Sequence, residues 1–190
     1  GILESIVQGV HLDLAPIHLS PQRSLKQAAA LLTVCESKSD DPDLLRNNLG
    51  LDPLGQLART GHSVLSLDQE VERCVEMTAD VASNYPHITP ISIDGSVWAG
   101  AGASDSQELG AVLSAGVLWV RALLASGFDI DEVPNKMEIT LTAGPDQFMT
   151  TAKIRAARVC WAQVMSACGA TPTKAPIAIH AETLQAMMTK

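Results

Sequence analysis

The 190-residue chain is poor in aromatic residues and in basic residues. Phe, Trp and Tyr make up 3% of the sequence, so the core must be built largely from Leu, Val, Ile and Ala. Lys and Arg number 13 against 21 Asp and Glu, which leaves a net charge of -8. Because nucleic-acid surfaces need clustered Lys and Arg to displace phosphate counterions, this balance argues against a nucleic-acid partner.

The sequence also lacks paired cysteines, since its four lie far apart without a CxxC spacing: Cys35, Cys74, Cys160 and Cys168. A disulfide framework or a zinc site is therefore not indicated, and we expect a reducing, cytoplasmic location. Cys160 and Cys168 lie on a predicted helix with no activating neighbour beyond Arg158, so we expect both to be core thiols.

No apolar run reaches the roughly 20 residues that span a bilayer, and no signal peptide opens the sequence, so we expect no membrane partner. Hydrophobic residues make up 46% of the chain, enough for one globular domain with a substantial core. The chain begins at Gly1 inside a hydrophobic stretch and ends at Lys190 soon after a strand-like run. We therefore expect flanking sequence on both sides.

Short strand-like runs alternate with longer helical patterns. The runs favour strands at 10–19 (interrupted by Pro16), 48–51, 88–94, 137–142 and 177–180. The intervening patterns favour helices at 21–36, 67–83, 105–126 and 146–168. In the last of these helices we expect an apolar stripe at helical spacing, formed by Ala152, Ala156, Val159, Cys160, Val164 and Ala167.

Two kinds of signal mark helix ends. Ser104 with Gln107, and Asp105 with Glu108, have the spacing of a capping box and predict a helix start. Gly127 and Gly169 stand where helices are commonly closed by a left-handed residue.

This alternation predicts parallel βαβ units, arranged as a doubly wound sheet or as a (β/α)8 barrel. A complete TIM barrel needs roughly 250 residues, so the five or so predicted strands could form only part of one. Polar residues stand at the C-terminal ends of the predicted strands, where both architectures place ligands: Asp52, Asp94, Thr142, His180 and Glu182.

The glycines after the strand at 88–94, namely Gly95, Gly100 and Gly102, raise the possibility of an anion site at a helix N-terminus. The spacing completes neither GxGxxG nor GxxxxGK[ST], and Asp105 and Glu108 would repel a phosphate. A flexible turn followed by a capped helix is the alternative interpretation.

Two histidines stand near carboxylates, in His180-x-Glu182 and His11-x-Asp13. Either could supply an acid, a base or a metal ligand, but a metal would need a third partner, and a hydrogen-bonded structural histidine is commoner. Ser96 lacks the GxSxG context of a nucleophile. The residues alone therefore predict a parallel α/β domain with a ligand-type edge and no complete catalytic set.

Three stretches resemble the adenosylcobalamin-dependent acyl-CoA mutases, of which methylmalonyl-CoA mutase is the type. Residues 148–162, FMTTAKIRAARVCWA, resemble that family's F-x-x-x-A-K-x-R-A-A-R-x-x-W-A helix. Residues 91–103, ISIDGSVWAGAGA, resemble the barrel strand and turn that read close to I-S-I-S-G-Y-H-M-Q-E-A-G-A, and IHAET at 179–183 is similar to A-H-C-Q-T. The resemblance implies that residues 1–190 are a central portion of an acyl-CoA mutase-like TIM barrel.

The chain departs from the family at the positions that carry chemistry. Ser96 and Val97 replace the Tyr-His pair that lies over the substrate and the corrin, and Ala99 and Gly100 replace the following Gln-Glu. Glu182 stands where the family has glutamine, although His180 is retained. Residues 48–52 are similar to the strand that reads T-I-Q-N-D, with Gly50 in place of another active-site glutamine.

These departures make the chain similar to the small (β) subunits of heterodimeric members of the family. The resemblance implies a catalytically inactive barrel with vestigial positions Ser96, Val97, Gly50, His180 and Glu182. Its expected partner is a large (α) subunit that carries adenosylcobalamin and interconverts methylmalonyl-CoA and succinyl-CoA by radical rearrangement. The D-x-H-x-x-G signature of cobalamin binding does not occur in these residues, so no cobalamin-binding domain is expected here.

Two alternatives remain open at this point. One is a catalytically competent acyl-CoA mutase barrel with an altered pocket, using His180 and Glu182. The other is a stand-alone α/β binding module.

Overall fold

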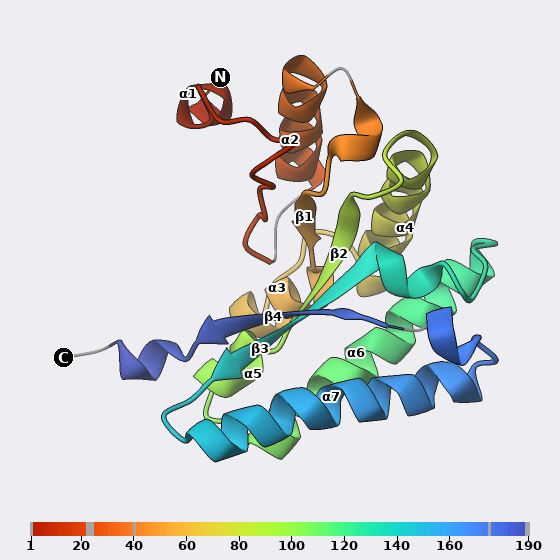
Figure 1. Ribbon diagram of the computed structural model, residues 1–190. Helices are drawn as coiled ribbons and strands as arrows, with labels where there is room; N and C mark the ends of the chain where they lie inside the picture. Colours follow the sequence, from red (N-terminus) through yellow and green to blue (C-terminus); the bar gives the residue numbers. More distant parts are fainter. Residues whose placement is uncertain (1, 22–24, 40, 175, 189–190) are drawn as a thin grey trace.

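The computed structural model describes residues 2–21, 25–39, 41–174 and 176–188. Within these residues, four strands form one parallel sheet in the order β1, β2, β3, β4: Asn48–Leu51, Thr89–Asp94, Met137–Ala143 and Ala178–Thr183. Each strand lies beside the next one along the chain, with helices between them, as expected for successive βαβ units. The structure is thus an α/β domain with a parallel sheet (Figure 1).

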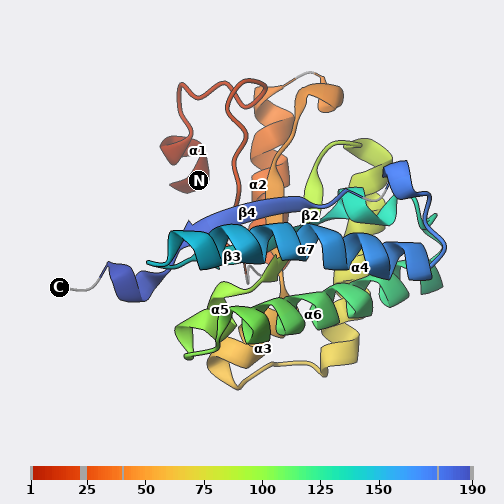
Figure 2. The same cartoon turned by 60° about the horizontal axis from the view of Figure 1, so that its bottom comes forward.

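Helices cover one face of this sheet. Helices α6 and α7 lie side by side along that face, as both Figure 1 and Figure 2 show, and α4 packs against β2 and α6. The helices of the described residues are α1 (Ile2–Ile6), α2 (Leu25–Lys38), α3 (Pro53–Thr60), α4 (Leu67–Asn84), α5 (Ser96–Gly100), α6 (Asp105–Ala125) and α7 (Gln147–Ala167). Single 3-10 turns lie at Pro42–Leu44, Val133–Lys136, Pro172–Lys174 and Gln185–Met187.

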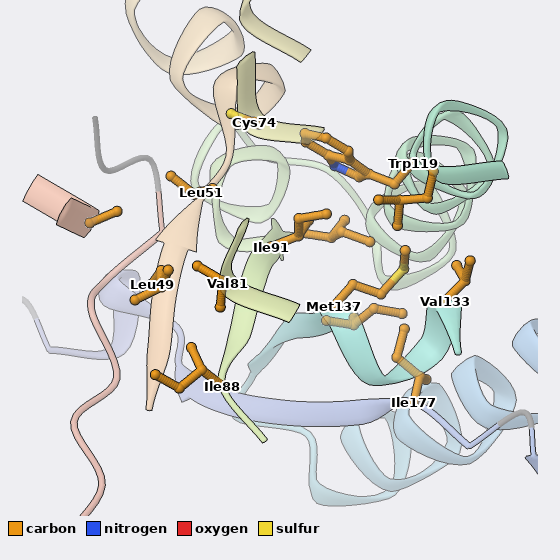
Figure 3. Packing of buried hydrophobic residues seen from close by; sticks show 14 of the residues in the cluster. Leu49, Leu51, Cys74, Val81, Ile88, Ile91, Trp119, Val133, Met137 and Ile177 are labelled. Carbon is orange, nitrogen blue, oxygen red and sulfur yellow. The ribbon is translucent and has the colours of Figure 1, made fainter. Parts of the chain in front are cut away.

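The core lies between the sheet and these helices. Figure 3 shows Ile91 of β2 and Met137 of β3 gathered near Trp119 of α6. All three side chains are buried. Because successive strand residues point to opposite faces, Ile91 and Met137 are each followed by a polar residue on the other face of the sheet, Ser92 and Glu138.

Gly116 allows α6 and α7 to approach closely. A Cβ atom at this position would lie 2.6 Å from Cζ3 of Trp161 on α7. Helix α6 is also long and apolar enough, by length and composition alone, to cross a membrane. In the structure it packs into the core through Val112, Trp119 and Leu123, as a core helix does.

The predicted strand at 10–19 is wrong. Residues 11–15 form a turn in which His11 O accepts from Leu14 N and Ala15 N, and Pro16 follows directly. The segment touches the sheet at a single bridge, between His18 and Asn48. The described residues therefore contribute four strands to the sheet rather than about five.

The other four strands and the four long helices are confirmed within a few residues at each end. The predicted helix at 21–36 begins in the structure at Leu25, and residues 22–24 of that prediction lie outside the described residues. Three short helices, α1, α3 and α5, were not predicted. Helix α3 has a sequence signal that was overlooked, since Asp52 caps it and Pro53 occupies its first turn.

The predicted helix ends are confirmed in part. Ser104 and Gln107 form a capping box at the start of α6, and Gly127 and Gly169 have φ of 93° and 89° after α6 and α7. The second predicted box is wrong, because the side chain of Glu108 turns inward and bonds to β3 and α7.

The apolar stripe expected on α7 is also wrong. The buried face of this helix is formed instead by Lys153, Ala157, Trp161 and Met165, while Ala152 and Val159 are exposed. The prediction failed because it left Lys153 off the buried face, where two carboxylates compensate its charge. All four cysteines are free thiols, and the two on or after α7 are not core residues: Cys160 is half-buried and Cys168 is exposed.

Candidate functional site

A small pocket lies at the C-terminal edge of the sheet. Its volume is about 310 Å³, and its walls come from α3, α5 and the ends of β3 and β4: Ala58, Arg59, Ser96, Val97, Gly100, Ala101, Thr142, Glu182, Thr183, Leu184 and Gln185. Three of the five vestigial positions, Ser96, Val97 and Glu182, are brought together here, although Glu182 lies 86 residues after Ser96 in the sequence. The pocket is therefore the candidate functional site.

The other two positions do not line this pocket. Gly50 lies in β1 with φ of 67°, and a Cβ atom there would be 2.7 Å from the carbonyl oxygen of Ser20 and 2.9 Å from that of Leu19. His180 pairs with Thr140 in the sheet register, and its side chain is exposed. Of the pair considered for an altered catalytic site, Glu182 therefore lines the pocket and His180 does not, although alternate residues of a strand share a face.

Asp94 does not line the pocket but contacts two residues that do, Ser96 and Arg59. Its Oδ1 accepts from Ser96 N at 2.9 Å, which positions the first residue of α5. Its Oδ2 lies 3.3 Å from Nη2 of Arg59, a half-exposed side chain on α3. Arg59 was not predicted as a site residue, because its pairing with Asp94 spans 35 residues of sequence.

A second buried carboxyl group, Asp52, lies next to Asp94. Its Oδ1 accepts from Gly55 N at 2.9 Å and its Oδ2 from Asp94 N at 3.2 Å. Burial raises the pKa of Asp52 to about 7, and the neighbouring charge of Asp94 adds to this, although the two N–H bonds and Arg59 oppose it. Gly55 leaves room for this carboxylate, since a Cβ atom there would collide with it.

Thr142, the pocket residue at the end of β3, is held by a buried ion pair. Glu108 of α6 accepts from Thr142 N at 2.7 Å and from its Oγ1 at 2.9 Å. Lys153 of α7 lies 2.5 Å from Glu108 Oε2 and 2.6 Å from Asp105 Oδ1. Burial alone would lower the pKa of Lys153, but the bonds with Asp105 and Glu108 outweigh it and raise this pKa.

The glycine-rich turn has few N–H groups left for an anion. Gly95 N donates to the carbonyl oxygen of Thr140, and Ser96 N donates to Asp94. The buried carboxylate of Asp94 would also repel a phosphate at this place. The structure therefore favours the alternative interpretation, a turn followed by a capped helix.

The structure offers no support for the metal alternatives. His11 and Asp13 are exposed on the turn before the sheet. Across the described ranges, no three His, Cys, Asp or Glu side chains are grouped closely enough to hold a metal ion.

The polar face of the sheet carries a second network, away from the pocket. Asn48 Oδ1 accepts from Ser92 Oγ at 3.0 Å and from Gly50 N at 2.8 Å, and Asn48 Nδ2 donates to Glu138 Oε1 at 2.9 Å. Glu138 Oε2 lies 3.6 Å from Nδ1 of His18. Side chains of β1, β2 and β3 therefore bond to one another across this face.

A parallel sheet with a polar pocket at the carboxyl ends of its strands is the arrangement of α/β proteins that bind small molecules at this edge. Comparison with known proteins narrows the class. The family model described as methylmalonyl-CoA mutase matches residues 3–190, and the chain belongs to this family.

Three of the relatives that match more than four fifths of this chain are named as small subunits. The chain is 37% identical over 189 residues to a protein of Streptomyces virginiae named methylmalonyl-CoA mutase small subunit. The matched region covers 99% of this chain and 30% of the relative. A probable small subunit of Mycobacterium tuberculosis is 32% identical over 190 residues, with the same two shares. The small subunit of Propionibacterium freudenreichii subsp. shermanii is 30% identical over 163 residues, or 85% of this chain and 25% of the relative. The chain thus spans about a third or less of these relatives' length.

Proposed function

We propose that this chain is the central part of the barrel of a small, non-catalytic subunit of heterodimeric methylmalonyl-CoA mutase. Its role is to support a large subunit that interconverts methylmalonyl-CoA and succinyl-CoA. The observation that carries the proposal is the pocket wall at Ser96 and Val97, which stand where catalytic chains of the family have Tyr and His.

The chemistry of that wall supports the proposal. Rearrangement of a thioester needs hydrogen-bond donors aimed at the carbonyl oxygen, where charge develops during the reaction. Val97 has no polar atom in its side chain, and the loss of one such donor costs about a hundredfold or more in rate. Loss of the Tyr-His pair together with the neighbouring Gln-Glu leaves little catalysis to expect.

The polar face of the sheet supports the same conclusion. The polar side-chain atoms of Asn48 and Glu138 contact neighbouring strands and His18 rather than a ligand. At Gly50, where the resemblance to the family implies a glutamine in catalytic chains, the backbone of Leu19 and Ser20 occupies the space that a side chain would need. A substrate on this face would have to displace both the polar network and the backbone of Leu19 and Ser20.

The barrel assignment rests on the edges of the domain. Strand β4 has β3 as its neighbour on one side, and most of its residues are exposed. Helix α7 exposes Phe148 and Val159 on its outer surface, at 85% and 59%. In a barrel, a further strand would pair with β4 and a further helix would pack against α7. The greater length of the relatives leaves room for both.

We place the cofactor on the partner chain. The residues of the 310 Å³ pocket do not fit a cobalamin, because none of its lining side chains is a histidine or another nitrogen donor suited to cobalt. The name small subunit carried by the relatives implies a larger partner. A cytoplasmic location is part of the proposal.

Association with a large chain tests the proposal. The full-length small chain, expressed together with a methylmalonyl-CoA mutase large subunit, should co-purify with it in a one-to-one complex, with cobalamin bound by the large chain alone. A full-length chain that remains monomeric beside the large subunit would contradict the assignment and favour a stand-alone binding module.

A further inference from the structure

Glu108 is the side chain at which α6, β3 and α7 meet beside the pocket. It begins on the first turn of α6, bonds to Thr142 at the end of β3 through both carboxylate oxygens, and pairs with Lys153 of α7. The side chains of Glu108 and Lys153 are 1% and 2% exposed. Lys153 Nζ also lies 3.1 Å from Thr142 Oγ1, which closes a ring of buried contacts.

The same carboxylate supports the opposite wall of the pocket. A Cβ atom at position 95 would lie 2.8 Å from Glu108 Oε1 and 2.6 Å from the carbonyl oxygen of Thr140. Gly95 therefore rests against Glu108, and the next two residues are the pocket positions Ser96 and Val97. A shift of this carboxylate would move the turn that leads into α5.

We infer that Lys153 is a positioning residue, through which α7 sets the shape of the pocket. The order of contacts is Lys153 to Glu108, then Glu108 to the Gly95 turn on one wall and to Thr142 on the other. The stretch at 148–162 thus reaches the Gly95 turn of the stretch at 91–103 through Glu108. The inference is independent of whether the chain is catalytic.

This coupling gives α7 a means of acting on the pocket. The outer surface of α7 is exposed at Phe148 and Val159, while Lys153 points inward from the same helix. A displacement of α7 would carry Lys153, and with it Glu108, to a new position. The pocket walls at the Gly95 turn and at Thr142 would then respond to a displacement of α7.

Hydrogen exchange in the full-length chain tests the inference. The two reporting segments are 95–101 and 140–143, and the variants are Lys153→Met and Lys153→Arg. The control is Leu31→Ala, which removes a buried side chain of α2 far from the network. We expect both Lys153 variants to raise exchange in both segments by about tenfold over the control, after correction for global stability. The Arg variant keeps the positive charge, so exchange in the two segments can be measured in it even if the Met variant does not fold.

Tryptophan quenching provides a second readout. Trp98 on α5 is 37% exposed, whereas Trp119 and Trp161 are buried, so acrylamide quenching reports mainly on α5. We expect faster quenching in Lys153→Arg and no change in Leu31→Ala. Exchange and quenching that are equal in the Lys153 variants and the control would overturn the inference, because Lys153 would then add stability without positioning the pocket.

Discussion

The carbonyl oxygen of Ser20 occupies the place where a side chain at position 50 would begin, 2.7 Å from the Cβ that Gly50 lacks. The resemblance to the mutase family predicts that an active-site glutamine is replaced at this position. The contact makes the absence of a side chain at this position a requirement of the fold.

Gly50→Ala should therefore destabilise the protein. The residue has φ of 67°, and the added Cβ would meet two backbone oxygens that cannot easily move. We expect a loss of about 2 kcal/mol or more in the free energy of unfolding, measured by urea denaturation. Gly110→Ala is the matched control, since Gly110 lies within α6 with nothing close to its Cβ position. The control should gain about 0.5 kcal/mol or more; a Gly50 variant as stable as the control would contradict the packing described here.

Gly116→Ala should destabilise the contact between α6 and α7. The new methyl group would lie 2.6 Å from Cζ3 of Trp161, so one of the two helices must shift. We expect a loss of about 1–3 kcal/mol in the free energy of unfolding, with a change in the near-ultraviolet circular dichroism of Trp161. Gly110→Ala again serves as the control, because it adds the same methyl group to the exposed side of the same helix.

Asp52 should make stability fall as pH rises towards neutrality. Its pKa is raised from 3.8 to about 7 in the folded protein, so the folded state binds a proton that the unfolded state releases between these values. The free energy of unfolding should therefore decrease by about 2–3 kcal/mol from pH 5 to pH 8 on account of this group. Asp52→Asn, which keeps an oxygen for Gly55 N, should lose that slope in urea denaturation series. An unchanged slope would show that Asp52 is ionised throughout.

Lys153→Met should cost about 3–5 kcal/mol in the free energy of unfolding, because it leaves Glu108 buried without its counter-charge. Lys174→Met is the matched control, since Lys174 is largely exposed and lies 3.7 Å from Asp131. Exposed pairs of this kind contribute little, so thermal denaturation should show almost no change in the control. A similar loss in the two variants would contradict this prediction, because the buried pair would then contribute no more to the free energy of unfolding than the exposed one.

Much of the fold could be predicted because it depends on local patterns. The strands at β1, β2, β3 and β4 and the long helices between them follow from hydrophobic periodicity and from caps such as Ser104. The strand expected at 10–19 failed because Pro16 and the turn at His11 leave only one bridge to the sheet.

The site was less predictable because its contacts are distant in sequence. Ser96, Val97 and Glu182 could be placed from their strand ends and from the family resemblance, and the structure brings them into one pocket. The partners that hold this pocket could not be found in the same way. Glu108 meets Lys153 across 45 residues and Arg59 meets Asp94 across 35, and no local pattern marks either pair.

Turnover is the most direct test of the central claim, that this chain belongs to a non-catalytic subunit. The full-length chain, purified free of any large subunit, is supplied with adenosylcobalamin and methylmalonyl-CoA, and the formation of succinyl-CoA is followed over time. The account predicts no turnover above the rate without protein, and turnover when the large subunit is added. Sustained formation of succinyl-CoA by the isolated chain would contradict it.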